Sequence, residues 1–498
     1  MNKPPVWPLA DVPVNEKGRY PGHRLNLTPR QPARAALAAL CASVALLAGC
    51  SLTPPLADVA PALNTSWKSA QPEPGFTSTE QAGRWAQGEW WALFDDPTLN
   101  GLVQRANAAN QNVALAVANV AQAQAALASQ RASLFPTLGA TVSTSRSGGD
   151  ERSTSNAAAV GLNASWAPDL WGRLKESVRA QQANVQASEA DLAAARLSVQ
   201  GSLVNAYLAL READVELSLL DDTIAGYERS AAITQNRYDV GTAARTDALQ
   251  AQATLASARA SRVALQRTRT GYENAMALLL GVVPADFTLP SAEWRQTLPS
   301  VPVQLPSLLL LRRPDVAAAE RAVVAANAQI GVARAAYFPD FSLSAGLDGS
   351  ASNLSRLVSA PALAWSLGLS LAQSIFDGGS RSAQVDAARA SYDAAVARYR
   401  QSALTAVGEV EDQLLALNTL AEQTEQTRQS ADIAQRVEQQ MLNRYQAGLS
   451  DYTEVVSAQA SAISARRSVL QLQLQRQQAV VALIQAVGGG WQADWAAN

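Results

Sequence analysis

A long internal repeat constrains this chain of 498 residues more than any other feature of its sequence. The stretch NRYDVGTAARTDALQAQATLASAR at 236–259 returns 207 positions later as NRYQAGLSDYTEVVSAQASAISAR at 443–466, without a gap. An earlier pair, VAQAQAALASQRASLFP at 120–136 and VVAANAQIGVARAAYFP at 323–339, is shifted by 203 positions. A repeat of this length indicates a duplicated domain and not the short period of a solenoid.

Long helices are predicted in both halves, over residues 174–238 and 380–445. Both segments lack proline and are rich in Ala, Gln, Arg and Glu. Each would reach about 95–100 Å as a continuous helix. In the first segment, apolar residues recur every seven positions, which indicates a supercoiled seam. The seam is Ala-rich and buries little apolar area, so these helices need many neighbours. A fibrous coiled-coil stalk is an alternative that the helices alone do not exclude.

Four strands are predicted between the helices, two in each half. They are expected at about 137–148, 157–168, 339–349 and 362–375. In the last of them, large apolar residues from Leu363 to Leu371 alternate with small or polar ones. This period of two is typical of a strand with one apolar face, either in a membrane barrel or half-buried in a soluble sheet.

Aromatic residues at the strand ends favour the membrane barrel. Phe135 and Phe338 precede the two strand pairs, and Trp171 and Phe376 follow them. If each pair forms an antiparallel hairpin, all four aromatic residues lie at the same end of the strands, as in an interfacial aromatic girdle.

Four strands cannot close a membrane barrel, because even the smallest barrels need about eight. An open sheet edge is not tolerated in lipid. The barrel must therefore be shared between chains. Two copies would give about eight strands and three about twelve. The number of strands does not decide between a dimer and a trimer.

The first fifty residues have the layout of a secretory signal, with arginines followed by the apolar run AALAALCASVALLAGC. The final LAGC resembles a bacterial lipobox, which implies cleavage before Cys50 and a covalent lipid on its thiol. An ordinary signal with Cys50 incidental is the alternative. Ser51, rather than Asp, follows the cysteine, and by the same resemblance this favours the outer membrane.

Removal of residues 1–49 would take away the groups that most often carry catalysis. The one histidine, His23, and one of the two cysteines, Cys41, both lie in this leader. The mature chain would hold no disulfide and no Cys/His metal cluster. We therefore expect no metal, no cofactor beyond the lipid on Cys50, and no enzymatic role. The mature chain is mildly acidic and has no basic run, so we expect no binding of nucleic acid.

The mature sequence resembles the outer-membrane efflux proteins, the TolC-like channels, in their lipidated OprM/NodT branch. The matching motifs cover nearly all of it: WWALFDDPTLNGLV from Trp90, LLRRPDVAAAERAVVAANAQIGVARAAYFP from Leu310, FDGG from Phe376, and both RY-x-x-G tips. The resemblance implies a mainly helical fold, with a periplasmic α-barrel of long helices. It also implies a twelve-stranded β-barrel shared by a homotrimer, with four strands per chain.

The same resemblance implies a function, partners and a location. The trimer would be the passive exit duct of a tripartite pump for small molecules or drugs, with a periplasmic adaptor protein and an inner-membrane transporter of the resistance-nodulation-division type. It would sit in the outer membrane of a Gram-negative bacterium, with most of its mass in the periplasm. The alternatives are the outer channel of a type I protein-secretion system and, from another class, a structural coiled-coil lipoprotein.

The predicted domains follow the repeat. They are a signal peptide at 1–49, an N-terminal equatorial segment at 50–96, a first repeat at 97–280 with its tip near 238–247, an equatorial linker at 281–312, a second repeat at 313–487 with its tip near 445–454, and a tail at 488–498.

The two tips carry the candidate functional residues. Gly241 and Gly448 have the spacing of helix C-caps, and we expect Thr242 and Ser450 to start the returning helices. The resemblance makes the tips the periplasmic mouth, touched by the adaptor. The implied docking residues are Gly241, Thr242, Gly448, Leu449 and Ser450.

The resemblance also implies a gate at this mouth. Tyr445 and Glu454 match the family's gating tyrosine and first acidic residue, whereas Ser450 and Ser457 replace a basic and an acidic residue that some members carry. The candidate gate residues are Tyr445, Asp451, Glu454, Tyr238 and Asp247. The alternative is that the acids only favour helix N-termini, where the macrodipole attracts them.

Overall fold

The computed structural model describes residues 88–150, 152–301, 312–353 and 362–493, with shorter stretches at 52–56, 59–61, 66–69, 85, 356–357 and 495. Residues from Ser51 onward form one compact unit, and all that follows concerns this unit. The predicted signal peptide and Cys50 lie outside the described residues.

Helices dominate the fold, and those of the two halves have equal lengths in pairs. The longest, α5 and α10, have 67 residues each, their returning helices α6 and α11 have 35 each, and α4 and α8 have 22 each. The bounds are α3 Pro97–Ala109, α4 Gln111–Ala132, α5 Arg173–Asp239, α6 Arg245–Leu279, α8 Pro314–Ala335, α10 Ser380–Gln446 and α11 Tyr452–Ala486. Two short 3₁₀ helices are η1, Trp90–Phe94, and η2, Pro284–Asp286.

Capping residues set where the shorter helices begin. Asp96 accepts hydrogen bonds from the backbone amides at the start of α3, and Asn110 does the same for α4. Pro314 occupies the first turn of α8 with Asp315 beside it, and both residue types are favourable at this end of a helix. These caps fix the points at which the chain turns from linker into helix.

The four strands form one antiparallel sheet in the order β1-β2-β3-β4. Their bounds are β1 Thr137–Gly149, β2 Arg152–Trp166, β3 Asp340–Ala351 and β4 Ala362–Ala372. β2 begins five residues before its predicted start at 157, and β4 ends three residues before 375. The polar stretch before 157 shows no apolar alternation, but its backbone still pairs with β1, with Ser155 opposite Ser147 and, after an irregularity, Arg152 opposite Gly149.

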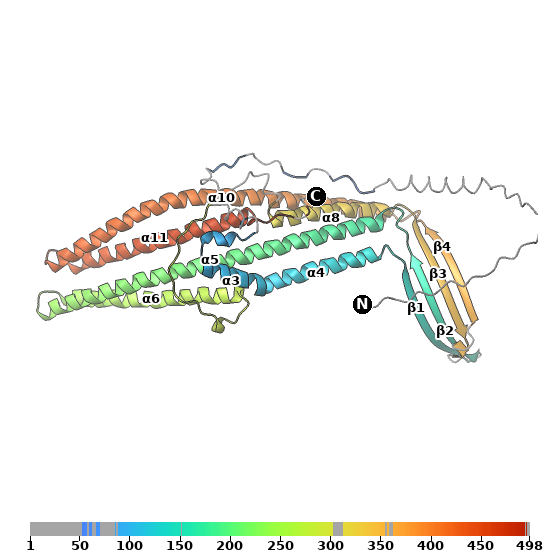
Figure 1. The fold of residues 1–498 in the computed structure, drawn as a ribbon, viewed down its shortest axis with the longest axis horizontal. Coiled ribbons are helices and arrows are strands. Elements are labelled where there is room, and N and C mark those ends of the chain that lie inside the picture. The colour runs from blue at the N-terminus through green and yellow to red at the C-terminus, as the bar shows by residue number, and fades with distance from the viewer. Residues whose placement is uncertain are drawn as a thin grey trace, which may run out of the picture. The chain divides into compact units, whose positions relative to one another are not determined.

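The strands lie at one end of the long helices, and the turns of both hairpins, α5–α6 and α10–α11, lie at the other (Figure 1). The main core lies between these ends, where η1 and α3 pack against the middle of α5 and the ends of α6 and α11. Trp90 is fully buried there, and its indole Nε1 donates to Gln200 at 2.9 Å. Smaller clusters lie between α8 and α10 and between the hairpin tips.

Candidate channel sites

The register of the sheet separates apolar from polar side chains onto two faces. On one face, pairings such as Leu347 with Trp365 and Leu343 with Leu369 place large apolar residues beside one another. That face carries Leu138, Val142, Val160, Leu162, Trp166, Leu343, Leu347, Leu363, Trp365, Leu367, Leu369 and Leu371. Trp365 is 80% exposed in the single chain. So large an apolar surface indicates contact with lipid or another protein.

Small and hydroxylated residues cover the opposite face, with Asn163, Asp340 and Asp348 among them. Gly161 lies under the Asp348 carboxylate: a Cβ at this position would come within 2.7 Å of Asp348 Oδ1 and 2.9 Å of Thr141 Oγ1. The missing side chain therefore lets the carboxylate lie flat across the sheet. This face is suited to line an aqueous space.

Of the four predicted girdle aromatics, the structure brings two together. Trp171 stacks on Phe338 with ring centroids 4.9 Å apart, and its Nε1 donates to the Pro339 carbonyl at 2.7 Å. Phe135 and Phe376 are 68% and 89% exposed. Neither stacks on another ring among the described residues.

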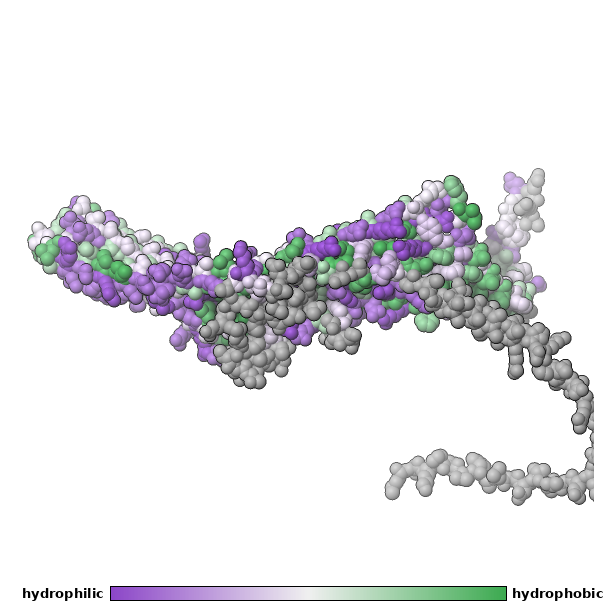
Figure 2. Space-filling model, turned by 90° about the horizontal axis from the view of Figure 1, so that it is seen from above, coloured by the Kyte–Doolittle hydropathy of each residue, from purple (hydrophilic) through white to green (hydrophobic). Residues whose placement is uncertain are grey.

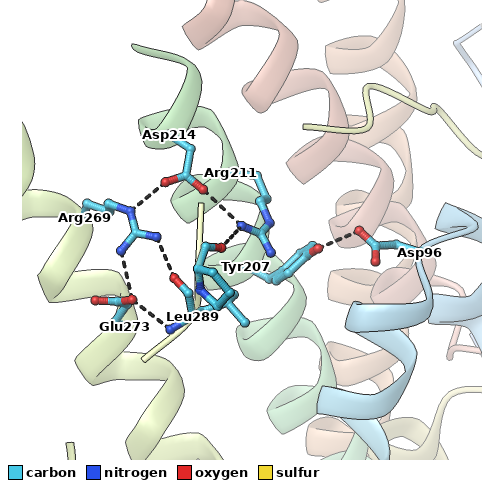
Figure 3. A network of polar contacts seen from close by, with 8 residues as sticks. Asp96, Tyr207, Arg211, Asp214, Arg269, Glu273 and Leu289 are labelled. Atoms are coloured by element: carbon cyan, nitrogen blue, oxygen red, sulfur yellow. Dashed lines mark hydrogen bonds and ion pairs between the residues drawn. The ribbon is translucent and has the colours of Figure 1, made fainter. Parts of the chain in front are cut away.

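A buried network of charges, which the sequence reasoning missed, holds the linker after α6 against the helices (Figure 3). Asp214 bridges two arginines, Arg211 at 3.0 Å and Arg269 at 2.6 Å, and all three side chains are at most 9% exposed. Such buried charges are tolerated only when each finds good partners. The only sequence signal is the charged READ in the apolar stretch YLALREADVEL.

Backbone groups of the linker complete this network. Arg269 donates to the carbonyl of Leu289 at 2.7 Å, and Arg211 donates to that of Pro290 at 2.8 Å. Glu273 accepts from the Leu289 amide at 2.9 Å. Side chains of α5 and α6 thereby satisfy these backbone groups of Leu289 and Pro290 in place of a strand partner.

The N-terminal segment is tied to the same part of α5. Tyr207 donates its hydroxyl to Asp96, the cap of α3, at 2.6 Å, and the Arg211 guanidinium lies 4.9 Å from the centre of its ring (Figure 3). Burial, with the hydrogen bond to Asp96, raises the pKa of Tyr207 to about 12. The phenol therefore stays a neutral donor.

A second buried acid lies one residue beyond Arg211. Burial, then the charge of nearby Glu216, raises the pKa of Glu212 to about 7, although Arg467 of α11 opposes this shift. Arg467 itself pairs with Glu216. One Glu212 carboxylate oxygen is buried and has no hydrogen-bond partner in the part of the chain that the structure describes, so this carboxyl group gains from being protonated.

Both hairpin turns have the hydrogen bonds of a Schellman motif. Gly241 donates to the Tyr238 carbonyl at 2.9 Å and Thr242 to that of Arg237 at 2.7 Å; in the second turn, Gly448 and Leu449 make the same bonds at 3.0 and 2.8 Å. Each glycine has φ of +75°. The predicted helix-ending role of both glycines is therefore confirmed.

The predicted helix-starting role of Thr242 and Ser450 is wrong. The N-cap residues are Ala244 for α6 and Asp451 for α11, and neither helix has a side-chain cap. The Thr242 hydroxyl donates backward to the Arg237 carbonyl at 3.0 Å. The turns are longer than expected because the Schellman bonds use the residues directly after each glycine.

Arg237 of the first hairpin joins it to the second one. Its guanidinium donates to the Tyr445 carbonyl at 2.6 Å and lies 4.7 Å from the centre of the Tyr445 ring. Tyr445 packs against Tyr452 with ring centroids 5.2 Å apart, and both are buried. Burial, with nearby Tyr445, Tyr227 and Asp247, raises the pKa of Tyr452 to about 12. Sequence reasoning found Tyr445 and missed its two partners.

The other gate candidates lie near the tips without forming one cluster. Tyr238 is 38% exposed. Asp247 and Glu454 lie in the first turns of α6 and α11, and Asp451 caps α11 through its backbone only. Val240 at the first turn and Leu449 at the second are 73% and 70% exposed. On the face drawn in Figure 2, most of the helical surface is hydrophilic.

None of the described helices is both long enough and apolar enough to span a membrane.

Solved structures with this architecture are outer-membrane channels. The chain aligns with the outer-membrane channel OprN at a TM-score of 0.77 and 30% identity, covering 87% of this chain and 99% of that one. It aligns with the Campylobacter jejuni CmeC outer membrane channel at a TM-score of 0.79 and 26% identity, covering 89% and 96%. The fold therefore places the protein among the TolC-like channels.

Sequence comparison gives the family. The model of the outer membrane efflux protein family matches residues 102–282 and 305–489, one segment in each half. The probable efflux pump outer membrane protein TtgC of Pseudomonas putida is 31% identical over 466 residues, which cover 91% of this chain and 96% of TtgC. The cation efflux system protein CusC of Escherichia coli O6:H1 is 31% identical over 457 residues, covering 91% and 98%. The chain belongs to the outer membrane efflux protein family.

Proposed function

We infer that this protein is the outer-membrane exit duct of a tripartite efflux pump. The observation that carries this inference is the match, along nearly the whole chain, to outer-membrane components of efflux pumps. The sheet is consistent with such a duct, because one face is apolar and the other polar. The relatives are named for efflux, which favours this function over type I protein secretion.

The working form is a homotrimer with a twelve-stranded barrel. Support comes from the sheet, whose β1 and β4 each leave one edge unpaired among the described residues. Such edges need partners in lipid. Cys50 carries the lipid anchor, and the helices extend into the periplasm as an α-barrel. Phe135, Trp171, Phe338 and Phe376 would lie at the periplasmic interface of the outer membrane.

The tips form the periplasmic mouth and meet an adaptor protein. Gly241, Thr242, Gly448, Leu449 and Ser450 are exposed or half-buried at the turns, which suits docking of a helical hairpin. Beyond the adaptor, an inner-membrane transporter of the resistance-nodulation-division type supplies energy and substrate. The duct itself conducts small molecules passively and performs no chemistry.

The gate lies where the two hairpins meet. Tyr445, held by Arg237, keeps the second hairpin against the first. Asp451, Glu454 and Asp247 would form rings of three in the trimer and narrow the mouth, with Tyr238 beside them. The relatives' names point to different cargoes, from cations in CusC to pyoverdine in OpmQ of Pseudomonas aeruginosa, so we assign only small molecules.

Two measurements test the proposed function. The protein purified from the outer membrane in detergent should have the mass of a trimer and should open ion-conducting channels in planar bilayers. A monomeric mass without conductance would refute the duct. In a host that lacks its own efflux duct, co-expression with a periplasmic adaptor and an inner-membrane transporter of the resistance-nodulation-division type should restore export.

A further inference from the structure

One ion pair joins the first helical hairpin, α5–α6, to the second, α10–α11. Arg467 of α11 donates from Nε to the carboxylate of Glu216 on α5, and Glu216 is 4% exposed. The neighbouring arginine, Arg466, pairs at 3.7 Å with Glu438 of α10 and so stays within the second hairpin. The contact between Arg467 and Glu216 therefore bears on how the two hairpins are held together.

A second carboxyl group lies at the same junction. Glu212 precedes Glu216 by about one helical turn and therefore lies on the same face of α5. It is buried, and one of its oxygens has no hydrogen-bond partner in the described part of the chain. The charge of Arg467 acts on Glu212 as well as on Glu216. Two buried acids thus share one cation.

The other titratable groups around these two acids are neutral or have partners of their own. Tyr272 of α6 faces both acids, and its pKa is raised by burial and then by their charges, so the phenol stays neutral. Arg211 and Arg269 pair with Asp214, and Glu273 pairs with Arg269 at 2.8 Å. Among the described residues, Arg467 is the cation that the two acids share.

Two cavities separate the hairpins between this junction and the tips. The first, of about 620 Å³, lies between α5, α6 and α11 and is lined by Arg467, Thr223 and Ser464 among others. The second, of about 330 Å³, lies between α5, α10 and α11. Gln459 lines it, and the buried side-chain oxygen of this residue has no partner among the described residues. The junction therefore has room to rearrange, and water can reach Arg467 from the first cavity.

The second repeat does not contain this group of charges. The three positions that lie 207 residues away from Glu212, Glu216 and Arg467 are all uncharged, and they hold Thr419, Gln423 and Ala260. The same helix packing is thus possible without the charges. The two acids and their arginine are an addition to one junction and not a general requirement of the fold.

We propose that Glu212, Glu216 and Arg467 form a pH-sensitive clasp between the two hairpins. When Glu212 is protonated, its hydroxyl can donate to Glu216, and Arg467 balances the one remaining carboxylate. Loss of the proton leaves two buried carboxylates at one arginine, which is costly. The segment of α11 around Arg467 then moves away from α5, and water enters from the first cavity.

The direction of the switch follows from the environment of Glu212. Burial, then the charge of Glu216, raises the pKa of this carboxyl group to about 7. The clasp is therefore closed at acidic pH and loosens as the pH rises through 7. It goes beyond the proposed function, because it lies within one chain and makes the contact between the hairpins respond to the pH around them.

Hydrogen exchange of the full-length wild-type protein in detergent tests the clasp. Protection of the amides at 463–471, corrected for the pH dependence of exchange in free peptides, should fall by about tenfold from pH 6 to pH 8, because pH 6 lies one unit below a pKa of about 7. Amides of α4, which contacts α5 far from Glu212, near Gln181 and Ser188, are the internal reference and should keep their protection.

Three variants identify the groups responsible. Glu212→Gln should keep the protection of 463–471 equal at the two pH values. Arg467→Gln removes the shared cation and should lower this protection at pH 6 as well. Arg466→Gln is the matched control, because it removes the adjacent arginine and a pair within the second hairpin. This control should retain the tenfold fall of the wild type.

Two results would overturn the clasp. One is equal protection of 463–471 at pH 6 and pH 8 in the wild type, which needs no variant to fold. The other is a fall in Glu212→Gln as large as in the wild type. Trimer mass and conductance of the same preparations keep this test separate from the proposed function. A conducting trimer without the pH effect refutes the clasp alone, and a monomer that shows the effect without conductance refutes the duct alone.

Discussion

The two hairpin tips have the same turn and different surroundings. Both glycines adopt φ of +75° and both turns make the same pair of hydrogen bonds. At the second tip Tyr445 and Tyr452 are 4% and 2% exposed, whereas at the first Tyr238 is 38% exposed and Arg245 replaces the second tyrosine. Duplication therefore preserved the turn, while packing against the other hairpin decided which tyrosine became core.

Removal of the buried tyrosine should have the largest effect. Tyr445→Ala leaves a cavity against Tyr452 and removes the ring under Arg237, which should cost roughly 3 kcal/mol. Hydrogen exchange of the amides at 443–456 should accelerate by about a hundredfold. Tyr238→Ala, at a position that is 38% exposed, should cost no more than about 1 kcal/mol. Equal effects at the two tips would contradict this comparison.

The second largest effect is expected at Glu212, a buried acid that only the first repeat has. In the second repeat, Thr419 occupies the equivalent position. The pKa of Glu212 is raised in the folded protein from its ordinary value of 4.5 to about 7. The folded state therefore holds the Glu212 proton more tightly than the unfolded state does. The stability that this proton contributes is fully present below pH 4.5 and is lost as the pH rises through 7. Glu212→Gln avoids this loss and should be more stable than the wild type at pH 8 by roughly 1–3 kcal/mol.

Thermal unfolding in detergent from pH 5 to pH 8 measures this difference. The melting temperature of Glu212→Gln should exceed that of the wild type at pH 8, and the gap should close toward pH 5. Glu228→Gln, at an exposed position on the same helix, is the matched control and should show no such trend. A gap that does not change with pH would rule out Glu212 as its source.

Alanine at either turn glycine should have a smaller and equal effect. Gly241→Ala and Gly448→Ala force a side chain into the left-handed region, which costs about 1 kcal/mol. Beyond the two neighbouring residues in the sequence, no atom of the described residues lies within 3.4 Å of a Cβ at either position, so conformation and not crowding sets the cost. Proteolytic cleavage at the two tips should accelerate equally. Clearly unequal rates would show that the turns differ in more than their surroundings.

The acids at the second tip should change stability least and conductance most. Asp451 and Glu454 are exposed, so Asp451→Asn with Glu454→Gln should alter stability by less than about 0.5 kcal/mol. If they narrow the mouth, conductance in planar bilayers should rise. Asp239→Asn, exposed at the end of α5, is the matched control. Unchanged conductance in the double variant would leave these acids with only a helix-terminal role.

Much of the fold was predictable because its signals are local. The turn glycines follow from the spacing after Arg-Tyr, and the strand alternation from a period of two. The least accurate bound, the start of β2, fell where backbone pairing continues through Arg152 to Ser155 without any apolar pattern. The helix-starting roles of Thr242 and Ser450 failed because either residue type can cap a helix, and only the three-dimensional turn decides whether it does.

By itself, the sequence determined the duplication, the turns, the two-faced strands and the family. Tertiary structure alone decided which member of each duplicated pair is buried. Trp171 meets Phe338, and Arg237 meets Tyr445, across more than 160 residues of chain. The Arg211–Asp214–Arg269 network likewise exists only because α6 and the linker bring partners to charges that would otherwise be too costly to bury. Burial depends on distant partners, which local sequence does not encode.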